Sequence, residues 1–104
     1  MIDDEELIKL INESEFLLEG LDKSFWRLIK LDTPEIWGNG GDRDSEYIWV
    51  VAIMGNRCVF FNNTTRHFNI GAYEQHGEVE TYYSYEEKLT DLIPNIISSR
   101  FKIS

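Results

Sequence analysis

The segment 46–54 constrains the fold more than any other, because an extended chain with this sequence is apolar on both of its faces. Successive side chains of a β-strand point to opposite sides. One side would carry Tyr47, Trp49, Val51 and Ile53, and the other would carry Ile48, Val50, Ala52 and Met54. A strand of this kind is typical of the centre of a sheet that is covered on both faces.

The residues after this strand predict an antiparallel meander. Gly55-Asn56 is a two-residue turn of the kind that closes a hairpin. Alternating apolar residues and turn residues then follow one another along the chain. In order, the segments are a strand at 57–62, a turn at 63–66, a short strand at 68–72 and a last strand at 78–83, which Gly77 opens.

Two segments before the central strand receive different interpretations. Residues 24–31 are rich in Phe, Trp, Leu and Ile, which favours a first strand. Residues 32–45 contain Pro34, three glycines and several polar side chains, so we expect a loop there. The sheet would then have about five strands.

Amphipathic helices are expected at both ends of the chain. Residues 4–19 carry an apolar stripe at helical spacing, and Gly20 is expected to stop this helix. Ser84 and Glu87 fit a capping box at the start of a C-terminal helix, which Pro94 should kink or split. The stripe of that second helix consists of Leu89, Leu92, Ile93, Ile96, Ile97 and Phe101.

The order of helix, strands and helix predicts a single α+β domain over residues 1–104. Short connections between consecutive strands imply antiparallel pairing. Because the two amphipathic helices need an apolar surface, we expect the N- and C-terminal helices to pack on one face of the antiparallel β-meander.

The excess of acidic residues limits the classes of macromolecule that the protein is expected to bind. Nineteen acidic and ten basic residues give a formal net charge of -9. Such a surface repels nucleic acid and anionic membranes, and it attracts basic proteins. The acidic N-terminus is unlike a secretory signal, and the longest apolar run, 47–54, is too short to cross a bilayer. We therefore expect a cytoplasmic protein that binds neither nucleic acid nor membranes.

Several residue sets could carry chemistry, but each lacks a necessary part. The glycine-rich run 38–42 is followed by neither the lysine nor the helix of a phosphate-binding loop. The acidic run 42–44 lacks most ligands of a calcium loop. Cys58, His67 and His76 are not spaced like zinc ligands, and Cys58 lies in an apolar run that favours a buried thiol. We predict no metal, no cofactor and no catalytic residue.

Glu78 and Glu80 are the best candidates for acid–base chemistry. In a strand they point to the same side as Tyr82, with Cα atoms about 6.5–7 Å apart. Carboxylates at such a distance can serve acid–base hydrolysis when they line a deep pocket, but nothing in the sequence marks one here. A solvated polar strand face and an acidic patch that meets a basic partner are the other two interpretations.

The acidic residues fall into two groups, depending on whether the expected local structure accounts for a negative charge at their positions. Those near the starts of the two expected helices are favoured by the helix dipole. Acids in loops and strands lack this explanation, because carboxylates are poor strand residues. We therefore predict a protein-binding surface made of Asp42, Asp44, Glu46, Glu74, Glu78 and Glu80, with Trp37, Tyr82 and Tyr85 as aromatic contacts. For each of these aromatic residues, a place in the core is at least an equal alternative.

The spacing of aromatic, asparagine and glycine residues resembles that of a known class of proteins. The positions are 47–55, 59–62 and 67–70, followed by Tyr73, Gly77 and Tyr82. In this pattern the chain resembles the small immunity proteins of bacterial polymorphic toxin systems, including those of contact-dependent growth inhibition. The resemblance covers about half of the chain, residues 45–97.

The resemblance implies a cytoplasmic protein without enzymatic activity that binds the C-terminal toxin domain of its own system and blocks its active site. Many of those toxins are nucleases with basic clefts, which suits an acidic inhibitor. The resemblance implies no fixed binding residues, because each pair has its own interface. The alternatives are a non-catalytic adaptor of another assembly and a small hydrolase that uses Glu78, Glu80 or a histidine. The sequence does not determine the oligomeric state, and strand 78–83 could be an edge that pairs with a partner strand.

Overall fold

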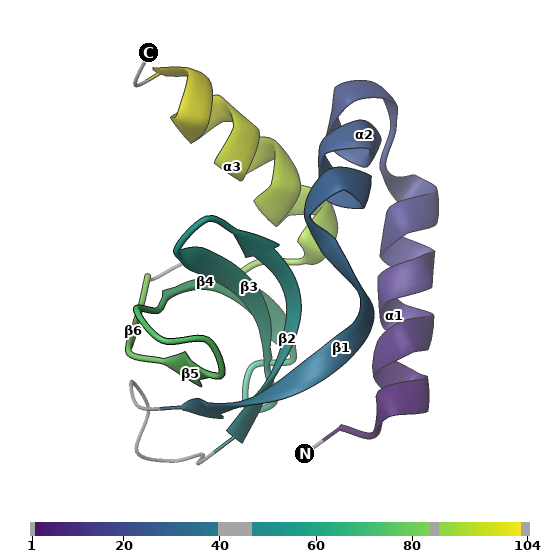
Figure 1. The fold of residues 1–104 in the computed structure, drawn as a ribbon. Coiled ribbons are helices and arrows are strands. Elements are labelled where there is room, and N and C mark those ends of the chain that lie inside the picture. The colour runs from purple at the N-terminus through teal and green to yellow at the C-terminus, as the bar shows by residue number, and fades with distance from the viewer. Residues whose placement is uncertain (1, 40–46, 84–85, 103–104) are drawn as a thin grey trace.

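The structure of the chain is a computed structural model that describes residues 2–39, 47–83 and 86–102. These residues form three helices and a six-stranded, mostly antiparallel sheet (Figure 1). The predicted α+β class, with helices at both ends of the chain, is confirmed. Among the helices of the described ranges, none is long and apolar enough to cross a membrane.

Helix α1 (Asp4–Leu17) corresponds to the predicted N-terminal helix. Asp3 caps it, because its side chain accepts a 2.8 Å hydrogen bond from the backbone N–H of Glu6. The helix ends before Leu18, whose backbone is extended. The prediction that Gly20 stops this helix is wrong, because Gly20, with a φ of +56°, begins the next one.

Helix α2 (Gly20–Ile29) occupies most of the segment that was expected to be a first strand, so that prediction is wrong. Leu21, Phe25 and Leu28 recur at intervals of four and three residues, which is the helical period. Trp26, on another side of the helix, is completely buried. Helical spacing thus outweighs the strand preference of the individual aromatic and β-branched residues.

Strand β1 (Lys30–Asn39) follows α2 directly. The prediction of a loop at 32–45 is therefore wrong as far as Asn39. Pro34 is compatible with this strand because the pairing of β1 with its neighbour is interrupted between Lys30 and Glu35. A proline has no N–H to donate to a ladder, and it is tolerated at such irregularities.

The central meander was predicted closely. It consists of β2 (Tyr47–Met54), β3 (Arg57–Asn62) and β4 (His67–Ala72), joined by turns at 55–56 and 63–66. All three strands pair antiparallel with their neighbours in the chain. The alternation of apolar and turn residues was sufficient to locate these elements.

A β-bulge in β2 changes which of its side chains share a face. The register with β3 shifts between Val50 and Ala52. As a result, Val51 and Ala52 both belong to the core beneath the helices, whereas Ile48 and Ile53 lie in the core on the other side. The strict alternation expected along this strand is therefore wrong beyond Val51.

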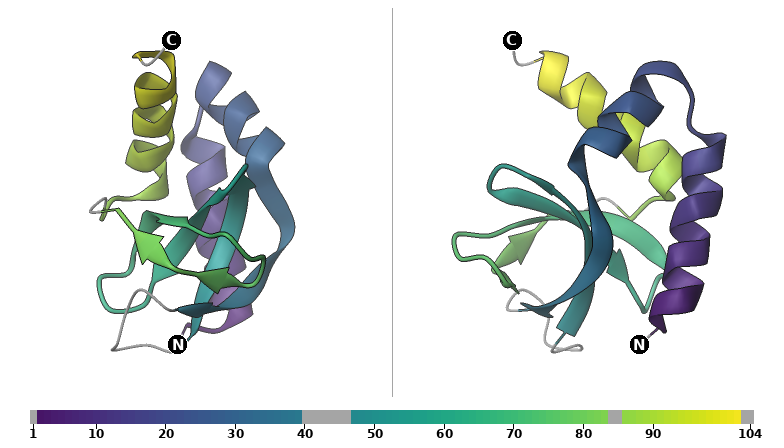
Figure 2. Two further views of the ribbon diagram at one scale, coloured as in Figure 1. Left: turned by 60° about the vertical axis from the view of Figure 1, so that its left-hand side comes forward. Right: turned by 45° about the vertical axis from the view of Figure 1, so that its right-hand side comes forward.

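A single short segment, residues 77–83, pairs with both outer strands of the four-stranded unit β1–β4; we call it the closing segment. Its first strand, β5 (Glu78–Val79), pairs parallel with β1, and its second, β6 (Thr81–Tyr82), pairs antiparallel with β4. The sheet order is therefore β5-β1-β2-β3-β4-β6, and the sheet curls until its ends meet (Figure 2). The two strands of this segment are the outermost strands of the sheet, each paired on one side only, so the prediction that 78–83 could be an edge agrees with the sheet order.

The curled sheet separates two apolar cores. The outer core lies between the sheet and the helices, which confirms that the N- and C-terminal helices pack on one face (Figure 2). The inner core lies between the sheet and the closing segment. Its buried members are Trp37, Ile48, Val50, Cys58, Phe60 and Val79. Two cores explain why the central strand is apolar on both faces.

Gly71 makes the closure of the sheet possible. A Cβ atom at this position would lie 2.7 Å from Cγ1 of Val79 and 3.3 Å from the ring of Phe60. The first distance is shorter than any normal carbon–carbon contact. The missing side chain in β4 thus leaves the space into which Val79 of the closing segment inserts.

Helix α3 (Leu89–Lys102) begins later than the sequence predicted. Glu87 is not part of a helical turn, because its backbone forms an antiparallel bridge with Phe68 of β4. The predicted capping box is therefore wrong, and Ser84 itself lies outside the described residues. Pro94 lies inside the helix, which continues past it as one element and is not split in two.

Candidate functional site

The closing segment carries two exposed acidic side chains on either side of a buried valine. Val79 is 0% exposed and fills the inner core, so the alternation of the backbone directs Glu78 and Glu80 outward. Glu74, in the connection that precedes the segment, is also exposed. We refer to Glu74, Glu78 and Glu80 together as the acidic face.

The backbone beneath the acidic face is fastened to both edges of the sheet. On the β1 side, Gly38 donates a 2.9 Å hydrogen bond to the carbonyl of Gly77. On the β4 side, Glu80 donates one of 3.0 Å to the carbonyl of Ala72, and Tyr83 donates one of 2.9 Å to that of Ile70. The backbone that carries Glu78 and Glu80 is therefore fixed in position, whereas the two side chains extend into solvent.

The remaining predicted acids belong to the segment between the end of β1 and the start of β2. Asp42, Asp44 and Glu46 lie outside the described residues, as does Tyr85. Near the end of β1, however, Gly38 pairs with Tyr47 on one side and with Glu78 on the other. The segment 40–46 therefore starts from a strand that is paired with β5, and the chain resumes in β2 on the other side of β1.

Trp37 does not contact solvent, so its prediction as an interface aromatic is wrong. It lies in β1 rather than in a glycine-rich loop, and it is 2% exposed. Its ring packs edge-on against Tyr73 at 5.0 Å and lies 4.7 Å from the ring of His76. Its indole N–H donates a 2.9 Å hydrogen bond to Glu35. The alternative of a core position is the correct one.

Two exposed aromatic residues near the acidic face, Tyr47 and Tyr83, were not predicted as contacts from the sequence. Tyr47 is 55% exposed at the start of β2, and Tyr83 is 40% exposed at the end of the closing segment. The guanidinium of Arg57 lies 5.4 Å from the centre of the Tyr83 ring. The predicted aromatic contact Tyr82 lies in β6. Tyr47 was overlooked because its place in an apolar strand indicated a core residue.

Glu35 and His76 form a contact that fastens the β4–β5 connection to β1. Nε2 of His76 lies 3.3 Å from the same Glu35 oxygen that accepts the hydrogen bond of Trp37. The histidine side chain is 65% exposed and the glutamate 44%. Both residues position the connection that carries Glu74. The sequence analysis considered His76 only as a metal ligand or catalytic residue and did not consider Glu35, because their contact joins residues that are far apart in the chain.

The residues considered for metal binding or nucleophilic catalysis do not converge. Cys58 is completely buried, and burial raises the pKa of its thiol to about 12. A thiol with such a pKa is not the thiolate that nucleophilic catalysis needs. Within the described ranges, no three residues of the types His, Cys, Asp and Glu are grouped so that they could hold a metal ion.

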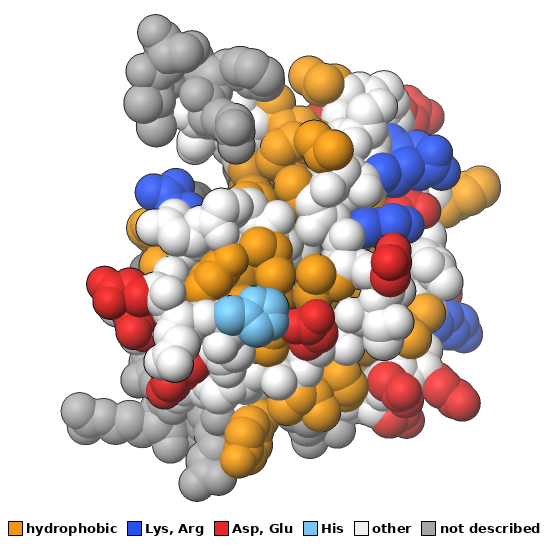
Figure 3. Space-filling view, in the orientation of Figure 1, with side chains coloured by type: hydrophobic (Ala, Val, Ile, Leu, Met, Phe, Trp, Pro, Cys, Tyr) orange, Lys and Arg blue, Asp and Glu red, His pale blue; other side chains and the backbone are white. Residues whose placement is uncertain are grey.

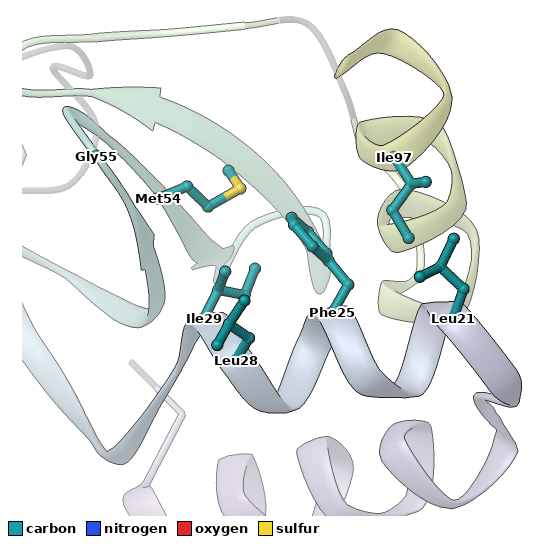
Figure 4. A pocket seen from close by; sticks show the side chains of 7 residues that line it. All are labelled: Leu21, Phe25, Leu28, Ile29, Met54, Gly55 and Ile97. Atoms are coloured by element: carbon teal, nitrogen blue, oxygen red, sulfur yellow. The ribbon is translucent and has the colours of Figure 1, made fainter. Parts of the chain in front are cut away.

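An apolar groove lies apart from the acidic face, and the sequence interpretation missed it because α2 was taken for a strand. It has a volume of about 250 Å³ and lies between α2, α3 and the β2–β3 turn (Figure 4). Figure 3 shows hydrophobic side chains gathered over the upper part of the molecule, with Lys and Arg side chains next to them. The lining residues are Leu21, Phe25, Leu28, Ile29, Met54, Gly55 and Ile97.

Comparison of the chain with known proteins finds no matching family model, no matching curated protein and no matching solved structure. The acidic face, the apolar groove and the sequence resemblance to immunity proteins are therefore the features that bear on function.

Proposed function

We propose that this protein is a cytoplasmic immunity protein that binds the C-terminal toxin domain of its own system and neutralises it without catalysing a reaction. The observation that carries the proposal is the acidic face. Glu74, Glu78 and Glu80 are all exposed, and the backbone of the closing segment, which presents Glu78 and Glu80, is hydrogen-bonded to both edges of the sheet. A fixed backbone reduces the entropy lost when a partner binds.

The chemistry of this surface fits a basic partner, most plainly a nuclease. A nuclease cleft presents basic residues to the phosphates of its substrate. A row of carboxylates can occupy such a cleft in place of the phosphates and thereby block it. The net charge of -9 would also accelerate the encounter with a basic domain.

Two observations support a binding role over the hydrolase alternative. Glu78 and Glu80 are exposed at the surface of the closing segment. The groove between α2 and α3 is lined by other residues, all of them apolar side chains or glycine. Paired carboxylates that hydrolyse a bond act from within a concave site that holds the substrate.

A non-catalytic adaptor of another assembly is the second candidate function. The observation that favours it is the apolar groove, whose Leu21 and Leu28 are 62% and 83% exposed. Groups of exposed apolar side chains commonly mark sites of protein interaction. An adaptor would use the groove and the acidic face for two different partners.

The first test is a pull-down from the native strain, with mass spectrometry of the retained proteins. We expect the wild type to retain the C-terminal domain of a co-encoded exoprotein and to inhibit that domain. The variant Glu78→Lys/Glu80→Lys should lose most of this retention. The matched control, Glu13→Lys/Glu19→Lys, changes the net charge equally at exposed positions of the helical region.

The proposal fails if the toxin domain is expressed but is not retained by the wild type. Equal retention by the two double variants would exclude the acidic face as the interface. If a complex without any toxin domain is retained instead, the adaptor function replaces the immunity function.

A further inference from the structure

We infer that Gly38, Tyr47 and Glu78 together form a recognition site for the side chain of an arginine in a protein partner. We call these three residues the arginine site. Under the proposed function, on which the choice of partner rests, the toxin domain supplies this arginine. The site adds an aromatic contact and a defined gap to the carboxylates of the acidic face.

The three residues lie side by side on three neighbouring strands (Figure 1). Gly38 of β1 pairs with Tyr47 of β2 on one side and with Glu78 of β5 on the other. Residues that are paired directly across strands point to the same face of a sheet. It is the face turned away from the inner core, because the adjacent residues Trp37 and Val79 belong to that core.

The missing side chain of Gly38 leaves a gap between the tyrosine and the carboxylate. Neighbouring strands lie about 4.8 Å apart, so the Cα atoms of Tyr47 and Glu78 are about 9–10 Å apart across Gly38. A Cβ atom built on Gly38 would lie 3.7 Å from Cγ of Glu78 and 3.8 Å from the carbonyl oxygen of Gly77. No other atom of the described residues would lie within 4 Å of it. The gap therefore has room for a flat group on the side of Tyr47.

Both walls of this gap are accessible to a partner. Tyr47 is 55% exposed, and Glu78 is also exposed. Among the described residues, none forms an ion pair or a side-chain hydrogen bond with the carboxylate of Glu78. Ile36, two residues before Gly38 on the same face of β1, is 52% exposed. A partner can thus reach an aromatic ring, a carboxylate and an aliphatic side chain at one place.

An arginine side chain matches these three features. Its guanidinium group is planar, so one plane can lie against an aromatic ring while the N–H groups at its edge donate two hydrogen bonds to a carboxylate. Its aliphatic stem can cover an apolar residue such as Ile36. A lysine would satisfy the charge alone, because its ammonium group is compact and strongly hydrated. The site therefore favours arginine over lysine.

The backbone of the arginine site is fixed by the sheet. The N–H of Gly38 donates a 2.9 Å hydrogen bond to the carbonyl of Gly77, and the N–H of Glu78 donates one of 3.3 Å to the carbonyl of Gln75. Tyr47 begins β2 and is paired with Gly38. Binding would therefore order side chains but not the backbone, which reduces the entropy lost on association.

The other exposed aromatic residue near the acidic face shows the same chemistry within the molecule. Tyr83 is 40% exposed, and the guanidinium of Arg57 lies 5.4 Å from the centre of its ring. Because an arginine of the chain itself is already placed over this ring, Tyr83 is a poorer contact for a partner arginine than Tyr47.

The first test needs no toxin and uses the intact protein with a small probe, N-acetylarginine N′-methylamide. We expect this probe to shift the NMR signals of the Gly38 amide and the Tyr47 ring in a saturable manner. The lysine analogue should bind at least about threefold more weakly. Gly38→Val fills the gap with a residue type common in strands, so it should weaken binding of the arginine probe at least about fivefold. The control Tyr83→Leu, at the other exposed aromatic residue, should leave this binding unchanged.

The second test uses the toxin domain, with each of its surface arginines replaced by lysine in turn. At one position this replacement should weaken binding to the wild type about tenfold or more. The same replacement should change binding to Tyr47→Leu by less than about threefold, because the ring that distinguishes the two cations is then missing. Glu78→Gln should likewise reduce the effect of that replacement.

The two tests separate the arginine site from the immunity function. Equal binding of the two probes, no binding of either probe, or unchanged binding of the arginine probe to Gly38→Val would overturn the inference. A retained toxin domain in which the effect of no arginine depends on Tyr47 would overturn it as well, while leaving the immunity function intact. If the arginine probe binds as expected but the toxin domain is not retained, the arginine site stands and the immunity function fails.

Discussion

At the scale of single residues, Gly71 and Val79 decide whether the sheet can close. Sequence patterns place Gly71 in a short strand, but they do not reveal why that position lacks a side chain. The reason is a contact between residues of β4 and of the closing segment, and such contacts depend on the three-dimensional pairing of strands. Gly71 is required here by the 2.7 Å approach of Val79, not by an unusual backbone angle.

Gly71→Ala should therefore lower the free energy of unfolding by about 1–3 kcal/mol, because the added methyl group overpacks the inner core. Adding Val79→Ala should restore part of this loss, although Val79→Ala alone is destabilising. Gly38→Ala is the control, since a Cβ there would lie 3.7 Å from its nearest neighbour. Urea denaturation of the four variants measures the coupling. Strict additivity of the Gly71 and Val79 substitutions would contradict the contact.

The exposure of the acidic face was predictable from single residues, whereas the position of Trp37 was not. Carboxylates in strands are costly to bury, so Glu78 and Glu80 were expected to be on the surface. Trp37 was assigned to a loop because proline and glycine lie near it in the sequence. In the structure the strand continues past Pro34, where its pairing with β2 is interrupted, and Trp37 is buried in the inner core.

At the scale of helices and strands, local patterns located the central meander but not the elements that flank it. Strands β2, β3 and β4 pair with their neighbours in the chain, so their alternation and turns were sufficient. The parallel pairing of β5 with β1 joins Gly38 to Glu78, and nothing local marks it. Helix α2 was mistaken for a strand because its residues have high strand preference individually.

One ion pair attaches the start of β1 to α1. Nζ of Lys30 lies 2.6 Å from Oε1 of Glu15, and this hydrogen bond, with the charges of Lys30 and Arg27, lowers the pKa of Glu15 below its usual value. A carboxyl group whose pKa is lower in the folded chain stabilises the fold above its unfolded pKa, near 4.3. That contribution is lost as the pH falls through the folded pKa.

Glu15→Gln should accordingly reduce the free energy of unfolding by about 1 kcal/mol at pH 7. The difference from the wild type should shrink as the pH falls below about 4, because the wild-type carboxyl is then protonated as well. Chemical denaturation at pH 7 and pH 3 provides the measurement, with the exposed Glu13→Gln as the control. A difference that is the same at both pH values would show that packing, not charge, explains the effect.

At the scale of the whole molecule, the two candidate surfaces are built on different elements. Glu78 and Glu80 lie on the closing segment, whereas most of the groove is formed by α2 and α3 (Figures 1 and 2). The surfaces approach each other at the β2–β3 turn, where Tyr73, next to Glu74, donates a 2.6 Å hydrogen bond to the carbonyl of Gly55 in the groove. The chain exposes 6580 Å². An interface of standard size covers about 800 Å² on each partner, which is roughly an eighth of that surface. The exposed area is therefore large enough for two interfaces of this size.

The net charge of the molecule predicts how its association with the proposed toxin depends on salt. Between about 50 mM and 500 mM salt, the association rate constant should fall by about tenfold or more, while the dissociation rate constant changes little. Surface plasmon resonance with the purified toxin domain measures both constants. An association rate that is independent of salt would mean that the acidic face does not guide the encounter.

The closing segment also determines how the molecule opens. Because residues 77–83 pair with β1 at one end and with β4 at the other, their release would uncover two strand edges in a single event. The amide hydrogens of Gly38 and Tyr83, which bond across those two edges, should then show the same free energy of opening in hydrogen exchange. The outer edges of β1 and β4 would thus behave as one cooperative unit, although forty-five residues separate those amides in the sequence.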